Sequence, residues 1–203
     1  PRALFRERED ELLQMTRMAP FRDRRATNLS GGMKQKLALM CTLIHRPRVL
    51  LLDEPTTGVD PISRREFWKL LAGLPAEGVT ILVSTPYLDE AARCHRLGFM
   101  AGGRLLAVDT PDALKRFAPP IIYSIRVEPQ RAARDFLRAH EVAEGAEVFG
   151  DRLHVSLREG ATPEALATIL QDAGFTASTP ERVEPSLDDA FVALARREEA
   201  RDA

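Results

Sequence analysis

Residues 49–55 (VLLLDEP) constrain the fold of this chain more than any other stretch. Four consecutive apolar residues without polar alternation predict a strand buried on both faces, as in a parallel sheet covered by helices. Because Pro55 has no amide proton for a sheet ladder, the strand ends there and Asp53 and Glu54 emerge at its carboxyl edge, where open α/β sheets bind ligands. Acids so placed can hold Mg²⁺ and orient an attacking water, although a simple helix-capping turn is the alternative for this motif alone.

A second motif, residues 29–35 (LSGGMKQ), lies upstream of that strand. Ser30 is a good N-cap for a helix, and Gly31 and Gly32 leave the first backbone amides uncovered by side chains. A helix N-terminus with bare amides is a site for phosphate. Taken alone, the motif also fits an ordinary flexible turn and cap.

Together, LSGGMKQ, VLLLDEP and the following residues 58–61 (GVDP) resemble the signature motif, Walker B strand and D-loop of ABC transporter ATP-binding subunits. The resemblance covers roughly residues 11–112, and these motifs in this order are highly specific. It implies an α/β fold, with part of the ABC-type P-loop NTPase sheet and its helices, and ATP and Mg²⁺ as cofactors. In that family Glu54 would polarise the attacking water, Asp53 would hold Mg²⁺, and Asp60 would lie at the dimer seam.

The same resemblance implies two ATPase domains that sandwich two nucleotides, so the partners are a second ABC ATPase domain and a transmembrane permease subunit. Four residues of the signature helix would serve the partner's nucleotide: Ser30, Gly31, Gly32 and Gln35. Asp53, Glu54 and the residue at position 86 would serve the chain's own nucleotide. Each nucleotide is then held between one Walker face and the other domain's signature helix.

The P-loop pattern GxxxxGK[ST] does not occur in the chain, since no lysine follows a glycine. That pattern cradles phosphates with backbone amides and a lysine. In the family it lies N-terminal to the residues present here. We therefore interpret the chain as the C-terminal portion of a longer subunit, and we expect it to bind ATP poorly and hydrolyse none by itself.

Pro86 occupies the position where the family places a histidine that contacts the γ-phosphate. Proline offers neither a ring donor nor an amide proton. Losing one donor to a developing phosphoryl charge costs on the order of 10²–10³ in rate, by analogy with oxyanion holes. Thr85 and Tyr87 are candidate substitutes; alternatively, Pro86 only opens the next helix at its first position. We expect ATP hydrolysis at the chain's own nucleotide site to be slow or absent. Such a domain would pair best with a non-identical ATPase domain.

The chain is expected to divide after residue 118, where Ala118-Pro119-Pro120 breaks the pattern. Residues 1–118 would hold the end of a helical subdomain and the Walker B half of the ATPase domain. In residues 119–203 the order strand, helix, strand, strand, helix, strand predicts a ferredoxin-like accessory domain. The further elements expected are helices over 30–46, 63–74 and 87–94, a strand over 79–84, a hairpin turning at Gly102-Gly103, and a last helix over 187–197, capped by Ser186, whose end frays.

Composition narrows the functional classes. The net charge of −1 gives no electrostatic reason to expect nucleic acid or an anionic membrane surface as a partner. Cys41 and Cys94 form no CxxC pair and are interpreted as reduced thiols of a cytosolic protein. No apolar run approaches the roughly 18 residues of a membrane span, so membrane passage belongs to another chain or to a part not present here. We expect a peripheral protein at the cytoplasmic face of the membrane.

Three functional hypotheses remain open. The first is an ATP-hydrolysing subunit that energises a membrane ABC transporter, with export expected, in which Glu54 is the catalytic residue. The second is a catalytically degenerate, nucleotide-gated clamp paired with an active ATPase domain. The third is a soluble ABC-type ATPase that acts on ribosomes or DNA, which the near-neutral charge disfavours.

Overall fold

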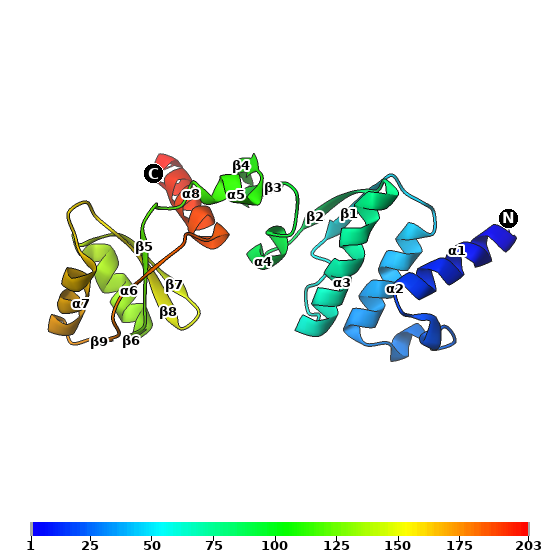
Figure 1. The fold of residues 1–203 in the computed structure, drawn as a ribbon, viewed down its shortest axis with the longest axis horizontal. Coiled ribbons are helices and arrows are strands. Elements are labelled where there is room, and N and C mark those ends of the chain that lie inside the picture. Colours follow the sequence, from blue (N-terminus) through cyan, green and yellow to red (C-terminus); the bar gives the residue numbers. More distant parts are fainter. Residues whose placement is uncertain (1, 203) are drawn as a thin grey trace. The chain divides into compact units, whose positions relative to one another are not determined.

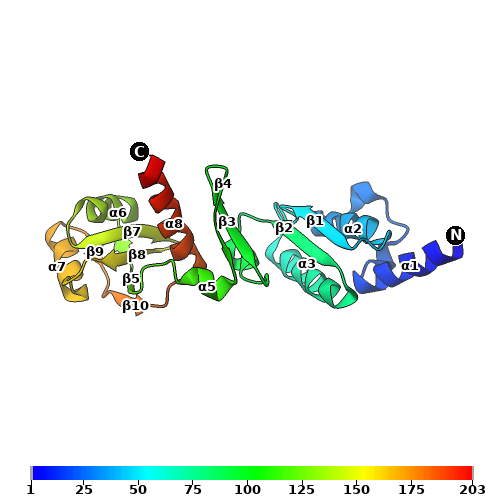
Figure 2. The ribbon, with the colours of Figure 1, turned by 90° about the horizontal axis from the view of Figure 1, so that it is seen from above.

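The computed structural model describes residues 2–202, which divide between Ala91 and Ala92 into two compact units. Each unit has its own helices and strands (Figure 1 and Figure 2). The first unit contains α1 (Arg2–Met15), η1 (Ala19–Phe21), η2 (Ala26–Asn28), α2 (Gly31–Leu43), β1 (Val49–Asp53), α3 (Pro61–Gly73), η3 (Leu74–Glu77), β2 (Thr80–Ser84) and α4 (Leu88–Ala91). The second contains β3 (Leu97–Ala101), β4 (Arg104–Asp109), α5 (Pro111–Lys115), β5 (Ile122–Ile125), β6 (Val127–Glu128), α6 (Gln130–Ala139), β7 (Ala143–Phe149), β8 (Arg152–Leu157), α7 (Pro163–Asp172), β9 (Thr176–Ala177), β10 (Glu181–Val183) and α8 (Leu187–Asp202).

The two long helices that precede and follow β1 begin at side-chain caps. The Ser30 hydroxyl accepts a hydrogen bond from the Met33 amide at 3.3 Å, as predicted for α2. Helix α3 begins at Pro61, two residues before the expected start, because Asp60 accepts hydrogen bonds from the amides of Ile62 (3.1 Å) and Ser63 (2.9 Å). An aspartate N-cap followed by proline is a regular way to open a helix.

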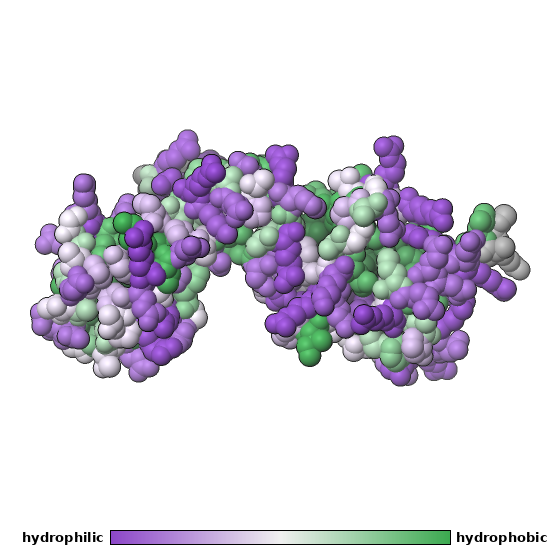
Figure 3. Space-filling view, in the orientation of Figure 1, coloured by the Kyte–Doolittle hydropathy of each residue, from purple (hydrophilic) through white to green (hydrophobic). Residues whose placement is uncertain are grey.

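Strands β1 and β2 are parallel neighbours, in a register that runs from Val49 opposite Thr80 to Asp53 opposite Ser84. The strand–helix–strand unit is therefore confirmed, but burial of β1 on both faces is wrong. Leu50 is only 4% exposed, whereas Leu51 is 70% exposed. Side chains of a strand alternate between faces, and among the described residues only one face of this two-stranded sheet is covered. Figure 3 shows hydrophobic atoms at the surface of this unit among hydrophilic ones.

The ferredoxin-like prediction for the later part of the chain is confirmed by the sheet topology. The four strands lie in the order β10-β5-β8-β7, and every neighbouring pair is antiparallel. In chain order β5, β7 and β8 are the first three strands of this sheet, and the third, β8, lies between the first two. This is a split βαβ arrangement. The expected hairpin is also present, with β3 and β4 joined across Gly102 and Gly103.

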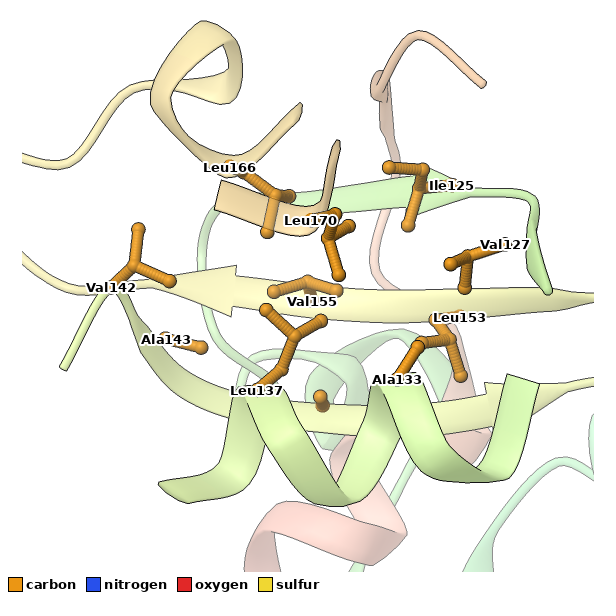
Figure 4. Close-up of a cluster of buried hydrophobic side chains, with 11 residues drawn as sticks. Ile125, Val127, Ala133, Leu137, Val142, Ala143, Leu153, Val155, Leu166 and Leu170 are labelled. Carbon is orange, nitrogen blue, oxygen red and sulfur yellow. The ribbon is translucent and has the colours of Figure 1, made fainter. Parts of the chain in front are cut away.

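The core of the second unit lies between the sheet and helices α6 and α7 (Figure 4). Leu137 on α6, Leu170 on α7, and Leu153 and Val155 on β8 are all fully buried. His154 lies between those two β8 residues, so it faces the opposite side of the sheet. Its hydrogen bond to Asp189 places α8 against that opposite face.

Helix α8 also packs on the hairpin and α5, which explains where the two compact units divide. Phe191 on α8 contacts Phe99 on β3 edge to face, with ring centroids 5.4 Å apart, and Glu198 pairs with Arg104 on β4 at 2.7 Å. The expected fraying at the end of this helix is wrong, since α8 continues to Asp202. The expected domain boundary after residue 118, where the accessory domain would begin, stays a prediction. None of the described helices is long and apolar enough to cross a bilayer.

Candidate functional site

Two carboxylates lie exposed where β1 ends, and the neighbouring strand holds them. Asp53 accepts a hydrogen bond from the hydroxyl of Ser84, its partner in the parallel register. The Glu54 amide donates to the Ser84 carbonyl oxygen (3.1 Å) and to the Ser84 hydroxyl (3.2 Å). One serine therefore fixes both acids to the carboxyl edge of β2.

Glu54 adopts a left-handed backbone conformation, with φ at +42°. Such a conformation is uncommon for a residue with a side chain, and backbone strain of this kind clusters at functional sites. Thr57 stabilises the turn, because its amide donates to the Glu54 carbonyl oxygen (3.1 Å) and its hydroxyl to Glu54 Oε2 (3.0 Å). The exposed Glu54 carboxylate thus has a fixed position.

Helices α2 and α3 make a close contact near their N-termini. A Cβ atom on Gly32 would lie 2.4 Å from the Ser63 Cβ, whereas one on Gly31 would meet only the Gly58 carbonyl oxygen, at 3.8 Å. Farther along the helices, Lys36 Nζ pairs with Glu66 Oε2 at 2.6 Å. The hydrogen bond and charge of Lys36 lower the pKa of Glu66. Gly32 is thus required for packing between the helices.

The remaining predicted ligand residues of these helices are accessible. Ser30, Gly31 and Asp60 are exposed, and Gln35 is half-buried. Hydrogen bonds from the Ser63 hydroxyl and amide hold the pKa of Asp60 below its usual value. Asp60 is therefore charged at neutral pH, and it already serves as the cap of α3.

The loop after β2 carries Pro86, which is exposed. Helix α4 begins at Leu88, so the alternative in which Pro86 is the first residue of that helix is wrong. The Thr85 hydroxyl donates to Glu90 Oε2 (2.7 Å) and accepts from the Tyr87 amide (3.1 Å). Its single proton is thus engaged within the protein, which leaves Thr85 without a hydroxyl proton for a phosphate.

The sequence and the fold agree with one group of known proteins. A family model described as "ABC transporter" matches residues 5–57. The probable multidrug ABC transporter ATP-binding protein YbhF of Escherichia coli K12 is 40% identical over 187 residues, which cover 90% of this chain and 32% of that protein. The daunorubicin resistance ATP-binding protein DrrA2 of Streptomyces coeruleorubidus is 36% identical over 93% of this chain and 61% of its own length. Over most of its length the chain is therefore similar to ABC transporter ATP-binding proteins.

Other ABC transporter ATP-binding proteins show the same partial overlap. The Nod factor export ATP-binding protein I of Rhizobium leguminosarum bv. viciae is 35% identical over 92% of this chain and 58% of its own length. The chain thus spans between about one third and three fifths of these relatives. Among solved structures, cbiO1 of Clostridium perfringens, part of an ABC transporter complex, is 34% identical with a TM-score of 0.53, over 56% of this chain and 46% of that one.

Reasoning from the ABC motifs missed four polar residues that shape the site: Ser84, Thr57, Ser63 and Glu90. A signal for Ser84 was present, because it ends the second apolar strand just as Asp53 ends the first. Parallel strands bring such residues to one edge. Glu90 had no local signal, since its partners come from distant segments.

The oxygen atoms at this edge fit the Mg²⁺ that the ABC family implies. Asp53 supplies a carboxylate and Ser84 a hydroxyl, both hard oxygen ligands. Among residues 2–202 no three His, Cys, Asp or Glu side chains converge on one point. Mg²⁺ suits such a sparse site, because it is usually bound by one or two carboxylates together with water and substrate phosphates.

Proposed function

We propose that this chain is part of the ATP-binding subunit that energises a membrane ABC transporter, most simply an exporter. The observation that carries the proposal is the exposed Asp53–Glu54 pair, fixed by Ser84 at the carboxyl edge of β1 and β2. The similarity to ABC transporter ATP-binding proteins supports it, and the relatives named for multidrug transport, daunorubicin resistance and Nod factor export favour export as the direction of transport.

In this proposal the two acids have separate roles. Asp53 holds Mg²⁺, which when bound neutralises charge on the phosphates. Glu54 orients and polarises the attacking water, and its left-handed backbone and the Thr57 hydroxyl fix its carboxylate. Positioning of this kind is most of what a protein contributes to phosphoryl transfer.

A second ATPase domain completes the arrangement. The start of α2 contacts the partner's nucleotide through Ser30, Gly31, Gly32 and Gln35, of which Ser30 and Gly31 are exposed, Gln35 is half-buried and Gly32 is buried. Asp60 lies at the seam between the domains. Bare amides and the positive end of the helix dipole favour a phosphate at that position. The contact between Gly32 and Ser63 supports the proposal, because it fixes the tip of α2 on α3.

We propose further that residues 1–118 are the C-terminal portion of the ATPase domain and residues 119–203 an accessory domain of one longer subunit. The open face of β1 and β2 supports this, since Val49, Leu51 and Leu82 are 56%, 70% and 67% exposed. Large contiguous apolar surfaces usually have a partner. The chain alone is then expected to be inactive, and the intact subunit to lie at the cytoplasmic face of the membrane beside its permease.

A nucleotide-gated clamp is the second candidate, and position 86 favours it. Pro86 has no donor, and the Thr85 proton is engaged by Glu90, so neither residue replaces the histidine that the family motif expects. The nucleotide site that contains Asp53, Glu54 and Pro86 then closes on ATP without rapid turnover.

ATP turnover of the intact subunit with its partner domain and permease, measured with Glu54→Gln, tests the two candidates. If the site that contains Glu54 hydrolyses ATP, removing this water-activating acid should lower turnover by on the order of 10²-fold or more. Turnover that is unchanged by Glu54→Gln supports the clamp instead. The matched control is Glu77→Gln at an exposed position in η3. A wild-type assembly without Mg²⁺-dependent ATP hydrolysis contradicts the energising role.

A further inference from the structure

Glu90 buries its carboxylate at the edge of the sheet, with only 1% of the residue exposed. It lies on the short helix α4, and three donors surround it. The Thr56 hydroxyl donates to Oε1 at 2.6 Å, the Thr85 hydroxyl donates to Oε2 at 2.7 Å, and Arg64 Nε pairs with Oε1 at 2.8 Å. A buried carboxylate needs such compensation, because burying an unpaired charge is costly.

Each donor to Glu90 comes from a different segment of the candidate site. Thr56 lies in the turn that begins with Glu54. Thr85 directly follows Ser84, which holds both exposed acids. Arg64 lies in the first turn of α3, and its amide donates to the carbonyl oxygen of the cap residue Asp60. Glu90 thus links the segments that follow β1 and β2 with the start of α3.

The guanidinium of Arg64 completes this network. Arg64 Nη2 donates to both oxygens of Asp89, at 3.1 and 3.0 Å, and its guanidinium lies over the Tyr87 ring, 4.3 Å from the centroid. Asp89 differs from Glu90 in its exposure, since the Asp89 side chain is 69% exposed whereas Glu90 is only 1% exposed. The two adjacent acids therefore share Arg64, and within the described part of the chain Glu90 alone of the two also bonds to Thr56 and Thr85.

We infer that Glu90 is a positioning residue that keeps three segments in register: the Glu54 turn, the loop after β2 and the start of α3. This inference rests on the proposed ATPase function for its consequence, but its geometry stands without it. Glu90 touches no reacting atom; it acts through Thr56, Thr85 and Arg64. Loss of the Glu90 carboxylate would let the segments that carry Asp53 and Glu54 shift relative to the start of α3, although Asp53, Glu54 and Asp60 are all still present.

Hydrogen–deuterium exchange on this 203-residue chain tests the positioning directly. Glu90→Gln keeps the size of the side chain, removes its charge and turns an NH₂ group toward the Thr85 hydroxyl, which donates in the wild type. We expect amide exchange to rise by about tenfold together in residues 54–59, 85–88 and 62–65, in line with local opening. Asp89→Asn, the matched control, should raise it less than twofold. Exchange that rises only within α4, or not at all, overturns the inference.

Thr85 provides a second variant in case Glu90→Gln does not fold. Thr85→Val removes the hydroxyl at nearly constant shape and should raise exchange in the 85–88 and 54–59 segments, while Thr85→Ser restores the hydroxyl and should return both to wild-type values. Valine and serine variants that exchange alike contradict the proposed link.

Turnover then separates this inference from the proposed function. In the intact subunit assembled with its partner, Glu90→Gln should lower kcat by about 10²-fold, because small displacements of positioned groups cost this much. KM for ATP should change less than threefold. Loss of ATP binding in proportion to turnover overturns the positioning role. A wild-type assembly without ATP turnover would contradict the proposed function. The hydrogen–deuterium exchange measurement would still decide the role of Glu90.

Discussion

The two units of the chain bury their central strands in opposite ways. In the second unit, β8 is covered on both faces: Leu153 and Val155 lie under α6 and α7, and His154 faces α8. In the first unit, β1 buries Leu50 but leaves Leu51 exposed. The more apolar strand, β1 (VLLLD), thus has an open face, whereas β8 (RLHVSL) lies in a closed core.

An aspartate in each unit accepts a hydrogen bond from a serine hydroxyl, but the two aspartates have different roles. Asp189 in the second unit accepts hydrogen bonds from the amide and hydroxyl of Ser186, and it pairs with His154 at 2.9 Å. Asp53 in the first unit likewise accepts from a serine hydroxyl, yet it is exposed. Buried and fully bonded, Asp189 is part of the scaffold, whereas exposed Asp53 retains capacity for a ligand. Accessibility, rather than residue type, distinguishes the two.

The largest contrast is expected in stability. Leu153→Ala removes a fully buried side chain and should lower the free energy of unfolding of the second unit by about 2–5 kcal/mol. Leu51→Ala alters an exposed side chain and should change the first unit by less than about 0.5 kcal/mol. Urea unfolding followed by far-UV circular dichroism measures both variants. Similar losses in the two would show that the face of β1 is covered in solution.

A smaller loss is expected where α2 meets α3. Gly32→Ala places a Cβ atom in contact with Ser63 and should cost about 1–3 kcal/mol through overpacking. Gly31→Ala has room and should be neutral or slightly stabilising. The fluorescence of Trp68, the one tryptophan of the chain, reports unfolding of the first unit.

Ser63→Gly is the matched second change for this helix contact. It removes the atom against which the new Cβ would collide, so the double variant with Gly32→Ala should recover most of the lost stability. Additive losses in the double variant would show that Gly32 is needed for some reason other than its contact with Ser63.

The third effect concerns acid stability of the second unit. Burial opposes ionisation of Asp189, but hydrogen bonds from His154 and Ser186 outweigh burial and lower its pKa. A lowered folded-state pKa contributes stability that is present above the unfolded value of about 3.9 and is lost as the pH falls through the folded value. Asp189→Asn should therefore be less stable at pH 7 and should flatten the acid dependence of unfolding below about pH 4. Exposed Asp172→Asn is the control, and equal acid dependence in wild type and Asp189→Asn would contradict this role.

Local chemistry made much of this fold predictable from the sequence. Ser30 caps α2, Thr162 caps α7 through the Ala165 amide, and two glycines close the β3–β4 hairpin. Each of these depends on neighbours within a few residues. The alternation of elements after residue 120 then predicted the ferredoxin-like topology, because few sheet orders connect such elements with short crossovers.

What the sequence could not give depends on distant contacts. An apolar run shows that β1 can be buried on both faces, but whether a layer covers Leu51 is decided by other segments. Trp68 is only 7% exposed, and tertiary packing rather than the local sequence decides that burial. The partners of Glu90 likewise follow from the fold, since Thr56 lies 34 residues away. The acids of the site were predictable from motifs, whereas the network that positions them was not.

In the proposed function, the exposed start of α2 contacts a nucleotide held by a second ATPase domain. Turnover of the intact subunit with that partner, compared between Ser30→Ala and Thr110→Ala, tests it most directly. Both changes remove a helix N-cap, since Thr110 caps α5 as Ser30 caps α2, and each should cost about 0.5–2 kcal/mol of stability. Ser30→Ala should in addition lower ATP turnover by about 10²-fold, as expected for the loss of a donor to phosphate. Equal turnover in the two variants would contradict the claim.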